Sequence, residues 1–411
     1  MKKVKVGVAG LGQRGLGLMN TMLACEEADI VAVCDFCEEK TILANDKVKE
    51  SRKHDVKRYL NYDEFLKDEE IQAVVVSSSW DEHIRMAVKS MKAGKITAME
   101  VGGAFDIEEC WELVRTYEET QTPFMMLENC CFDRFELLST SLTRNGVLGD
   151  VVHLHGAYSH DLRAEMLHNN LNYRIANYEK RNCENYPTHE LGPIAKILDI
   201  NRGNRMLSLV SVASKAKGLE DYANRDFDGK QSFKGLKAKQ GDIVSTIITC
   251  ANGETITLTL DTTLPKHYSR EFTVRGTKGY CVQETNSVYV EDSMNLHEFY
   301  EPHPTVQKYL NNAENYKEYL PDIWRTITKE EMELGHGGMD YMLFKAFFKA
   351  ILNGEDMPID VYDCASWMCI SAISENSISF GGMPQPIPDF TRGKWLYRKR
   401  LDVTNIPEVN K

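Results

Sequence analysis

The sequence has no excess of positive charge. Its 411 residues include 49 lysines and arginines against 61 aspartates and glutamates, which gives a net charge of −12. Binding to a nucleic-acid backbone needs clustered basic side chains, so this balance argues against a nucleic-acid partner. The chain also has no apolar stretch long enough to span a bilayer, which argues against a membrane partner.

Two further absences indicate the cellular compartment of the protein. No apolar run precedes the first expected strand, so we expect no signal peptide and a cytoplasmic protein, with export only if a leader has been removed. The 11 cysteines are scattered and do not have disulfide-like spacings. Cys34 and Cys37 have a redox-like spacing, but their place at a strand end favours two packed thiols. The cysteines therefore indicate a reducing compartment.

The N-terminus carries a dinucleotide fingerprint. An apolar strand ending at Ala9 runs into Gly10-Leu11-Gly12-Gln13-Arg14-Gly15 and then a helical pattern. In this G-x-G-x-x-G pattern Gly10 allows a tight turn, Gly12 lets the backbone approach a pyrophosphate, and Gly15 lets the helix pack on the strand. A second strand ends at Asp35, about 20 residues further on, where an acid binds the ribose hydroxyls. No arginine follows Asp35 directly, so the sequence predicts NAD in preference to NADP.

The arrangement of expected elements predicts an α/β fold with two domains. The first ~130 residues alternate strands and helices as a doubly wound parallel (Rossmann) sheet requires. The strands are expected at 72–77, 95–100 and 123–128, and the helices at 81–93 and 106–120, with Asp106 as N-cap. We therefore divide the chain into an NAD-binding domain over 1–130 and a substrate-binding domain over 131–411.

The second domain reads as α+β with a largely antiparallel sheet. Strands are expected at 151–160, 206–215, 242–251, 254–261, 270–275 and 279–284, and helices at 189–200, 338–352 and 360–379. Residues 218–240 are expected to form a surface loop and 291–335 a long irregular excursion.

Side chains suited to chemistry gather at the ends of these elements. In a doubly wound sheet, ligands bind at the carboxyl ends of the strands, which here carry residues 77–83, 100–103 and 128–131. Trp80 and His83 could flank the cofactor there, or could be a helix-start aromatic and a surface imidazole.

The second domain adds tyrosines and histidines at 158–161, 186–193, 266–270 and 335–340. Tyrosine and histidine transfer protons once their surroundings tune their pKa values. Each also has a purely structural explanation: Tyr158 in a core, His189 at a helix cap, Tyr268 on a sheet and His336 in a turn. Their repeated placement at element ends favours a site.

Other chemistries have weaker support. His153 and His155 share one face of a strand, with His160 and Asp161 near its end. A metal site there would need a sharp bend, so we predict no metal. The chain has no G-x-S-x-G elbow and no Ser-His-Asp order.

Several motifs in one order resemble a known family. The N-terminal half resembles the Gfo/Idh/MocA oxidoreductases. Within that group, the chain to about Tyr397 resembles glycoside hydrolase family 109, NAD-dependent glycosidases whose founding activity is α-N-acetylgalactosaminidase. The segments that match are Leu127–Cys131, Gly156–Tyr158, His160–Arg163, Tyr186–His189, Tyr268–Arg270, Gly335–Asp340 and Pro388–Gly393.

The resemblance implies roles by position. Together with the fingerprint glycines Gly10, Gly12 and Gly15, it implies cofactor contacts at Gln13, Arg14, Asp35, Trp80, His83, Glu100, Val101 and Asn129. The substrate-binding residues it implies, with His336 added from the Gly335–Asp340 segment, are Glu128, Arg174, Tyr186, His189, Tyr268 and His336. We expect the catalytic residues among Tyr158, His160, Tyr186 and His189.

Two departures refine the functional hypothesis. Gfo/Idh/MocA dehydrogenases carry Glu-Lys-Pro with a catalytic lysine where this chain has Glu100-Val101-Gly102. The glycosidase family has Glu-Val-Pro, so Val101 favours it and Gly102 departs from it.

The resemblance implies a glycosidase with tightly bound NAD. Its cycle would oxidise C3 of an N-acetylgalactosaminide or related glycoside, eliminate the C1 group, add water and reduce C3 again. The alternatives are an NAD-dependent sugar 3-dehydrogenase and a non-catalytic sugar-binding protein with bound NAD. By analogy with the family we also expect a homo-oligomer, dimeric or larger.

Overall fold

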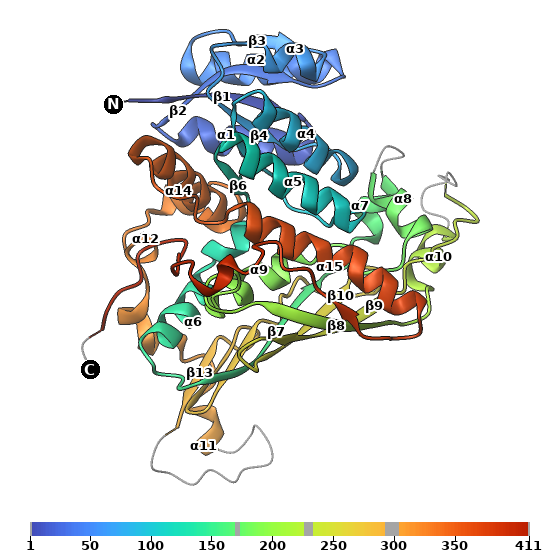
Figure 1. The fold of residues 1–411 in the computed structure, drawn as a ribbon, viewed down its shortest axis with the longest axis vertical. Coiled ribbons are helices and arrows are strands. Elements are labelled where there is room, and N and C mark those ends of the chain that lie inside the picture. The colour runs from blue at the N-terminus through green and yellow to red at the C-terminus, as the bar shows by residue number, and fades with distance from the viewer. Residues whose placement is uncertain (1, 169–172, 226–232, 292–303, 410–411) are drawn as a thin grey trace.

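The computed structural model describes residues 2–168, 173–225, 233–291 and 304–409 (Figure 1). Its first sheet is parallel, with strand order β3-β2-β1-β4-β5-β6. Because this order reverses between β1 and β4, a ligand crevice is expected beyond their carboxyl ends. The strands are β1 (Val4–Ala9), β2 (Ala28–Cys34), β3 (Lys57–Tyr59), β4 (Ala73–Val76), β5 (Ile96–Met99) and β6 (Phe124–Met126). The predicted Rossmann fold is confirmed.

Five helices accompany this sheet: α1 (Gln13–Ala24), α2 (Glu38–Arg52), α3 (Tyr62–Leu66), α4 (Trp80–Lys92) and α5 (Ile107–Thr120). Asp106 caps α5 as predicted, because its carboxylate accepts a hydrogen bond from the backbone N–H of Glu109 at 2.9 Å.

The second sheet has eight strands in the order β13-β12-β11-β7-β10-β9-β8-β14. Only the β7–β10 pair is parallel, so the predicted largely antiparallel sheet is confirmed. The strands are β7 (Val151–Ser159), β8 (Met206–Ala213), β9 (Ile243–Cys250), β10 (Thr255–Asp261), β11 (Thr273–Gly276), β12 (Gly279–Val282), β13 (Ser287–Val290) and β14 (Gln385–Pro386).

Helices pack against this sheet and connect it to the first one. The larger ones are α6 (Arg134–Arg144), α8 (Tyr173–Lys180), α9 (Thr188–Ile197), α14 (Met339–Asn353) and α15 (Val361–Ser379). The shorter ones are α7 (Arg163–His168), α10 (Gly218–Ala223), α11 (Pro304–Gln307), α12 (Asp322–Arg325) and α13 (Lys329–Met332), with 3₁₀ turns η1 (Asn129–Phe132), η2 (Ala313–Tyr319), η3 (His336–Gly338) and η4 (Lys394–Leu396). In the described residues, no helix is both long and apolar enough to cross a membrane.

Three segment predictions need correction. The expected loop at 218–240 begins with helix α10, and residues 226–232 of it lie outside the described residues. The expected excursion at 291–335 contains short helices, and its residues 292–303 likewise lie outside the described residues. The strand expected from residue 270 begins only at Thr273, since the preceding chain makes an isolated bridge between Ser269 and Ser159.

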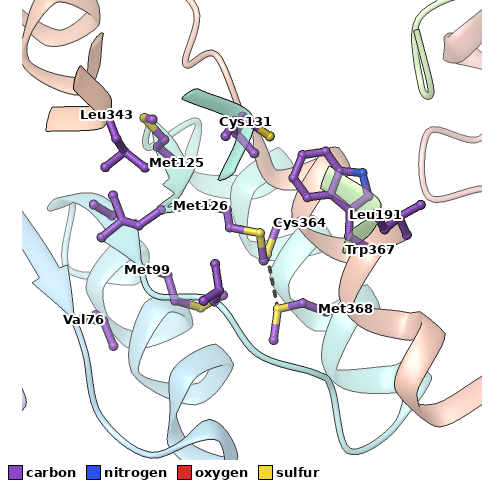
Figure 2. Close-up of a cluster of buried hydrophobic side chains, with 14 of the residues drawn as sticks. Val76, Met99, Met125, Met126, Cys131, Leu191, Leu343, Cys364, Trp367 and Met368 are labelled. Atoms are coloured by element: carbon purple, nitrogen blue, oxygen red, sulfur yellow. Dashed lines mark hydrogen bonds between the residues drawn. The ribbon is translucent and has the colours of Figure 1, made fainter. Parts of the chain in front are cut away.

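A buried, sulfur-rich cluster joins the first sheet to helix α15 (Figure 2). It brings Met99 and Met126 of the first sheet against Cys364, Trp367 and Met368 of α15. Backbone hydrogen bonds reinforce the junction, from Met126 N to Ile359 O and from Ala104 N to Met368 O, both 3.0 Å. Close packing of this kind has low compressibility. The strand ends of the first sheet are therefore held firmly against the second part of the chain.

Candidate active site

The glycine turn after β1 has the shape that a dinucleotide needs. Gly10 has φ +88°, and a Cβ there would lie 2.3 Å from the carbonyl oxygen of Ser77. By contrast, a Cβ at Gly12 would meet nothing within 4 Å, and Gly12 caps α1 without a side-chain hydrogen bond. The start of α1, which begins with Gln13, therefore has open space beside Gly12, as anion binding at a helix N-terminus requires.

Asp35 at the end of β2 fastens this turn. One carboxylate oxygen accepts a hydrogen bond from Leu11 N at 2.7 Å and the other accepts one from Cys37 N at 3.0 Å. Gly15 lets α1 approach the turn, since a Cβ there would lie 1.9 Å from the carbonyl oxygen of Gly10. The residues of the fingerprint thus fit a bound dinucleotide.

Arg14 joins the turn to distant parts of the chain. Its Nε lies 2.8 Å from Glu100 Oε1 at the end of β5. Its two terminal nitrogens donate to Asp340 at the start of α14, at 2.6 and 3.0 Å. Asn129 Nδ2 and His336 Nδ1 lie 2.8 and 2.9 Å from the same carboxylate. We call these five residues the Asp340 network.

The charge state of Asp340 follows from these contacts. Burial alone would raise its pKa, but the hydrogen bonds from His336 and Arg14 and the charge of Arg14 hold the pKa of this carboxyl well below its usual range. Asp340 was not among the predicted site residues. Its position in the Gly335–Asp340 motif was the only signal, because its partners Arg14 and Asn129 are remote in sequence.

Five predicted site residues form one aromatic cluster. The Tyr158 ring lies 4.5 Å from Tyr186, 4.8 Å from His160 and 5.6 Å from His189, measured between ring centroids. Tyr268 lies 5.2 Å from His160. These residues come from the end of β7, the start of α9 and the segment after β10. The structure therefore brings together all four predicted catalytic residues.

Two arginines border this cluster. Arg174 of α8 has Nη1 3.4 Å from the hydroxyl oxygen of Tyr158 and stacks over Tyr186 with a centroid distance of 5.4 Å. Arg270 Nη1 donates to the hydroxyl of Tyr268 at 3.0 Å. Burial raises the pKa of Tyr158, although the charge of Arg174 lowers it in part. Tyr158 is therefore neutral near pH 7 and can donate a hydrogen bond.

His189 is oriented by a buried carboxylate. Its Nδ1 lies 2.8 and 3.0 Å from the two oxygens of Glu128. Burial alone would raise the pKa of Glu128, but the charge of His189 and this hydrogen bond bring it below its ordinary value. An ionised Glu128 can only accept, so Nδ1 of His189 carries the hydrogen and Nε2 is the basic atom of the neutral ring.

Glu128 itself was predicted to bind substrate, and the structure gives it a different place. The side chain is fully buried, and one of its oxygens also accepts a hydrogen bond from Cys130 N at 3.0 Å. We therefore assign it the positioning of His189 in place of a contact with the sugar.

The surroundings of His160 differ from those of His189. Burial, together with the charges of Arg174 and His189, lowers the pKa of His160 to about 4. Its Nε2 is buried and has no hydrogen-bond partner among the described residues. His160 is therefore neutral near pH 7, with a ring nitrogen that can accept a proton.

The segments after β4 and β5 line the same region. Trp80, predicted to bind cofactor, lies 5.2 Å from the Tyr186 ring and 5.1 Å from the Arg174 guanidinium. A Cβ at Gly102 would lie 2.8 Å from the Trp80 ring, so glycine, in place of the expected proline, leaves room for it.

The side chains of Val101 and His83 are both buried. His83 Nε2 lies 3.0 Å from the carbonyl oxygen of Ser78. Burial lowers the pKa of His83 to about 4. His83 therefore bears no charge near pH 7, and Val101 offers no proton acceptor where a dehydrogenase has lysine.

One trio in the described residues has metal-ligand composition. Ligand atoms of Glu128, Cys130 and His189 lie within 4.8 Å of one another. Burial raises the pKa of the Cys130 thiol well above its ordinary value, and a protonated thiol is a poor ligand. Because Glu128 and His189 also bind each other, we assign no metal to this trio.

Comparison with known proteins places these features in a family. A model described as the glycosyl hydrolase 109 C-terminal domain matches residues 132–397, and one described as an oxidoreductase family NAD-binding Rossmann fold matches residues 4–127. The chain is 35% identical to an α-N-acetylgalactosaminidase from Tannerella forsythia, over 96% of this chain and 88% of that one. It is also 35% identical to a glycosyl hydrolase family 109 protein from Shewanella baltica, over 98% and 88%.

Solved structures with low sequence identity share the fold. A levoglucosan dehydrogenase in complex with NADH and levoglucosan has a TM-score of 0.69 at 17% identity, covering 94% of this chain and all of that one. A scyllo-inositol dehydrogenase from Lactobacillus casei has a TM-score of 0.64 at 13% identity, covering 94% and 99%.

The glycine turn, the two-sheet fold and the polar cluster at the strand ends define an NAD-binding enzyme of the Gfo/Idh/MocA oxidoreductase class. Within that class, the chain belongs to glycosyl hydrolase family 109. The family predicted from the sequence motifs is thereby confirmed.

Proposed function

We propose that the protein hydrolyses N-acetylgalactosaminides or a closely related glycoside, with NAD resident on the glycine turn. The observation that carries this proposal is the pair of histidines around Tyr158, His189 backed by Glu128 and His160 with a free nitrogen. A hydrolase with two glutamate or aspartate catalysts would instead need a pair of carboxylates flanking the sugar. The named relative from Tannerella forsythia supports the choice of sugar.

The cofactor would be held by the turn residues Gly10, Gly12, Gln13 and Gly15 and the backbone of Arg14, by Asp35, and by the strand-end residues Trp80, His83, Glu100, Val101 and Asn129. NAD, when bound, supplies reversible two-electron oxidation of a hydroxyl-bearing sugar carbon. Nε2 of His189 accepts the proton of the C3 hydroxyl, with Tyr186 beside it. Its tautomer is suited to this because Glu128 holds Nδ1 as the donor.

The second proton transfer takes place at His160 or Tyr158, away from His189. A carbonyl at C3 acidifies the C2 proton, and loss of that proton expels the group on C1. His160 removes it through its free ring nitrogen, or Tyr158 does so after losing its own proton, in a phenolate form that the positive charge of Arg174 stabilises. Arg174 and Tyr268 orient the sugar, and His336 binds it from the Asp340 network. Addition of water at C1 with return of a proton to C2, followed by return of the hydride and a proton at C3, would complete a net hydrolysis.

The test is release of the aryl group from an aryl α-N-acetylgalactosaminide with no NAD added, followed in D₂O. We expect release together with deuterium at C2 of the product, because proton removal at C2 exchanges it with solvent. A panel of aryl α- and β-glycosides defines the sugar and the anomer. Absence of release across the panel contradicts the proposal, and accumulation of reduced nicotinamide with an intact glycosidic bond supports a sugar dehydrogenase.

A further inference from the structure

Asp340 links segments that belong to different parts of the chain. Its two oxygens face Arg14 of the glycine turn, Asn129 at the end of the first sheet, and His336 four residues earlier. The Asp340 side chain is only 1% exposed. A buried carboxylate with so many partners is costly to separate from them, because each partner would be left without its hydrogen bond.

The charges in this network leave Arg14 little capacity to bind phosphate. Its guanidinium faces the carboxylates of Glu100 and Asp340, at 2.8 and 2.6 Å, so one positive charge is shared by two negative ones. A pyrophosphate gains little from a cation that is already neutralised in this way. Arg14 is thus better suited to hold the start of α14 against the turn than to attract the cofactor.

The backbone before Asp340 is shaped around this contact. Gly335, His336, Gly337 and Gly338 have φ values of +68°, +46°, +68° and +92°. For His336, a residue with a side chain, this left-handed conformation is strained. A Cβ at Gly335 would lie 2.5 Å from Asp340 Oδ2. The turn therefore brings His336 into contact with Asp340, and it has no room for a side chain at position 335.

We propose that Asp340 is a positioning residue that fastens α14 to the glycine turn and so retains NAD between turnovers. The inference rests on the proposed function only in taking NAD as a resident cofactor. Without Asp340, Arg14 keeps a single carboxylate partner, and the segment carrying His336 loses its tie to the turn. The start of α14 is then held less firmly beside the turn that binds NAD.

The experiment measures NAD in the purified full-length protein. Wild type and Asp340→Asn are desalted, and NAD per chain is determined after denaturation, with the dissociation rate followed in parallel. We expect NAD to leave Asp340→Asn about 10- to 100-fold faster, the range expected for hydrogen bonds to a charged group. Saturating external NAD should restore kcat, so that the defect appears in the apparent KM for NAD.

The matched control is Glu27→Gln. Glu27 forms an ion pair with Lys345, which also joins α14 to the first part of the chain but lies away from the turn. We expect Glu27→Gln to retain NAD as wild type does. Equal loss from both variants would show general loosening and overturn the proposal, as would unchanged or tighter retention by Asp340→Asn.

A second variant covers the case in which Asp340→Asn does not fold. Gly335→Ala places a methyl group against Asp340 Oδ2 without removing its charge, and it should also speed NAD release. Wild-type-like retention by Gly335→Ala would contradict the proposal. The readout is independent of glycoside cleavage, so inactivity of wild type on every glycoside would count against the proposed function while leaving the retention test valid.

Discussion

At the scale of single residues, the two histidines of the site differ in what surrounds them. His189 has an ionised carboxylate behind it, whereas His160 is buried near the positive charge of Arg174. Surroundings of this kind give chemically identical groups different proton affinities. This difference supports the proposed roles of His189 at the C3 hydroxyl and of His160 or Tyr158 at the C2 proton.

Substitution of Glu128 by glutamine tests the role of this carboxylate. The amide can donate to Nδ1 of His189, which would stabilise the wrong tautomer and leave Nε2 unable to accept a proton. By analogy with other oriented histidines, we expect kcat to fall about 10²- to 10⁴-fold with the fold retained. Steady-state kinetics and circular dichroism check this, with Glu118→Gln, an ion-paired carboxylate remote from the site, as control. A kcat within about threefold of wild type would refute the positioning role.

A second residue-scale prediction concerns two buried acids that bracket the Tyr186–His189 segment. Burial raises the pKa of Glu184 to about 7 and holds the pKa of its neighbour Glu190 well above its ordinary value. The folded state therefore binds more protons than the unfolded state above about pH 4.5, so the free energy of unfolding falls as pH rises towards 7.

Glu190→Gln removes one of these titrating groups. We expect the variant to be more stable than wild type at about pH 8, by about 1–3 kcal/mol, and to lose much of the pH dependence. Chemical unfolding at about pH 5 and pH 8 measures both quantities. Glu118→Gln should show the opposite sign at pH 8, because ion pairs and hydrogen bonds lower the pKa of Glu118. A destabilised Glu190→Gln at pH 8 would contradict this account of the acid pair.

At the scale of elements, the turn between β1 and α1 separates requirements of folding from requirements of binding. Gly10 and Gly15 are needed by the protein itself, since a Cβ at either would collide with backbone oxygens. Gly12 has φ −68°, which alanine adopts, and a Cβ there meets no protein atom. Gly12 is therefore needed only for a ligand.

Gly12→Ala should accordingly fold normally and bind NAD poorly. We expect its Tm without cofactor to stay within about 2 °C of wild type and its NAD affinity to fall at least about tenfold. Gly10→Ala should instead lower the Tm itself, because alanine at φ +88° is strained. Differential scanning fluorimetry with and without NAD distinguishes the two. Undiminished NAD stabilisation of Gly12→Ala would place the cofactor elsewhere.

The helices and strands differ in how far the sequence could predict them. Most strands of both sheets have clear apolar patterns, and Asp106 marks its helix with a cap, so these were predicted, whereas β13 and β14 of the second sheet were not. Helix α2 was missed because only Thr41, Ala44 and Val48 of its 15 residues are buried. Strand β3 has three residues and none is buried. The chemical types at the strand ends were predictable, but the role of Asp340 depends on partners that only the folded chain brings to it.

At the scale of the whole molecule, the C-terminal helices connect the two sheets. Helix α15 packs on α5 and β6 of the first part and on β8 of the second, and α14 packs on α1. We propose to keep the division into residues 1–130 and 131–411, with α14 and α15 as the parts of the second domain that contact the first. The site thereby lies at a packed junction, which suits a cofactor that stays in place.

The large sheet has a second face that carries apolar and β-branched side chains. Helices α9 and α15 lie on one side of it (Figure 1). On the other side, a cross-strand row runs from Val210 through Ile247 and Thr257 to His155. Ile247 and nearby Val212 are each 53% exposed in the single chain. Exposed apolar patches on a sheet face are typical of protein–protein contacts.

We expect this face to pair with the same face of a second copy, as a twofold dimer requires. Light scattering coupled to size exclusion should give about twice the chain mass of 46.9 kDa, or a larger multiple.

Ile247→Lys places a charge at the centre of the row and should yield a folded monomer, since burying an unpaired charge is costly. Tyr397→Lys, a change at an exposed aromatic away from the sheet, should keep the wild-type mass. A wild type that is monomeric at micromolar concentration would refute the oligomer, and an Ile247→Lys variant with unchanged mass would place the contact on another surface.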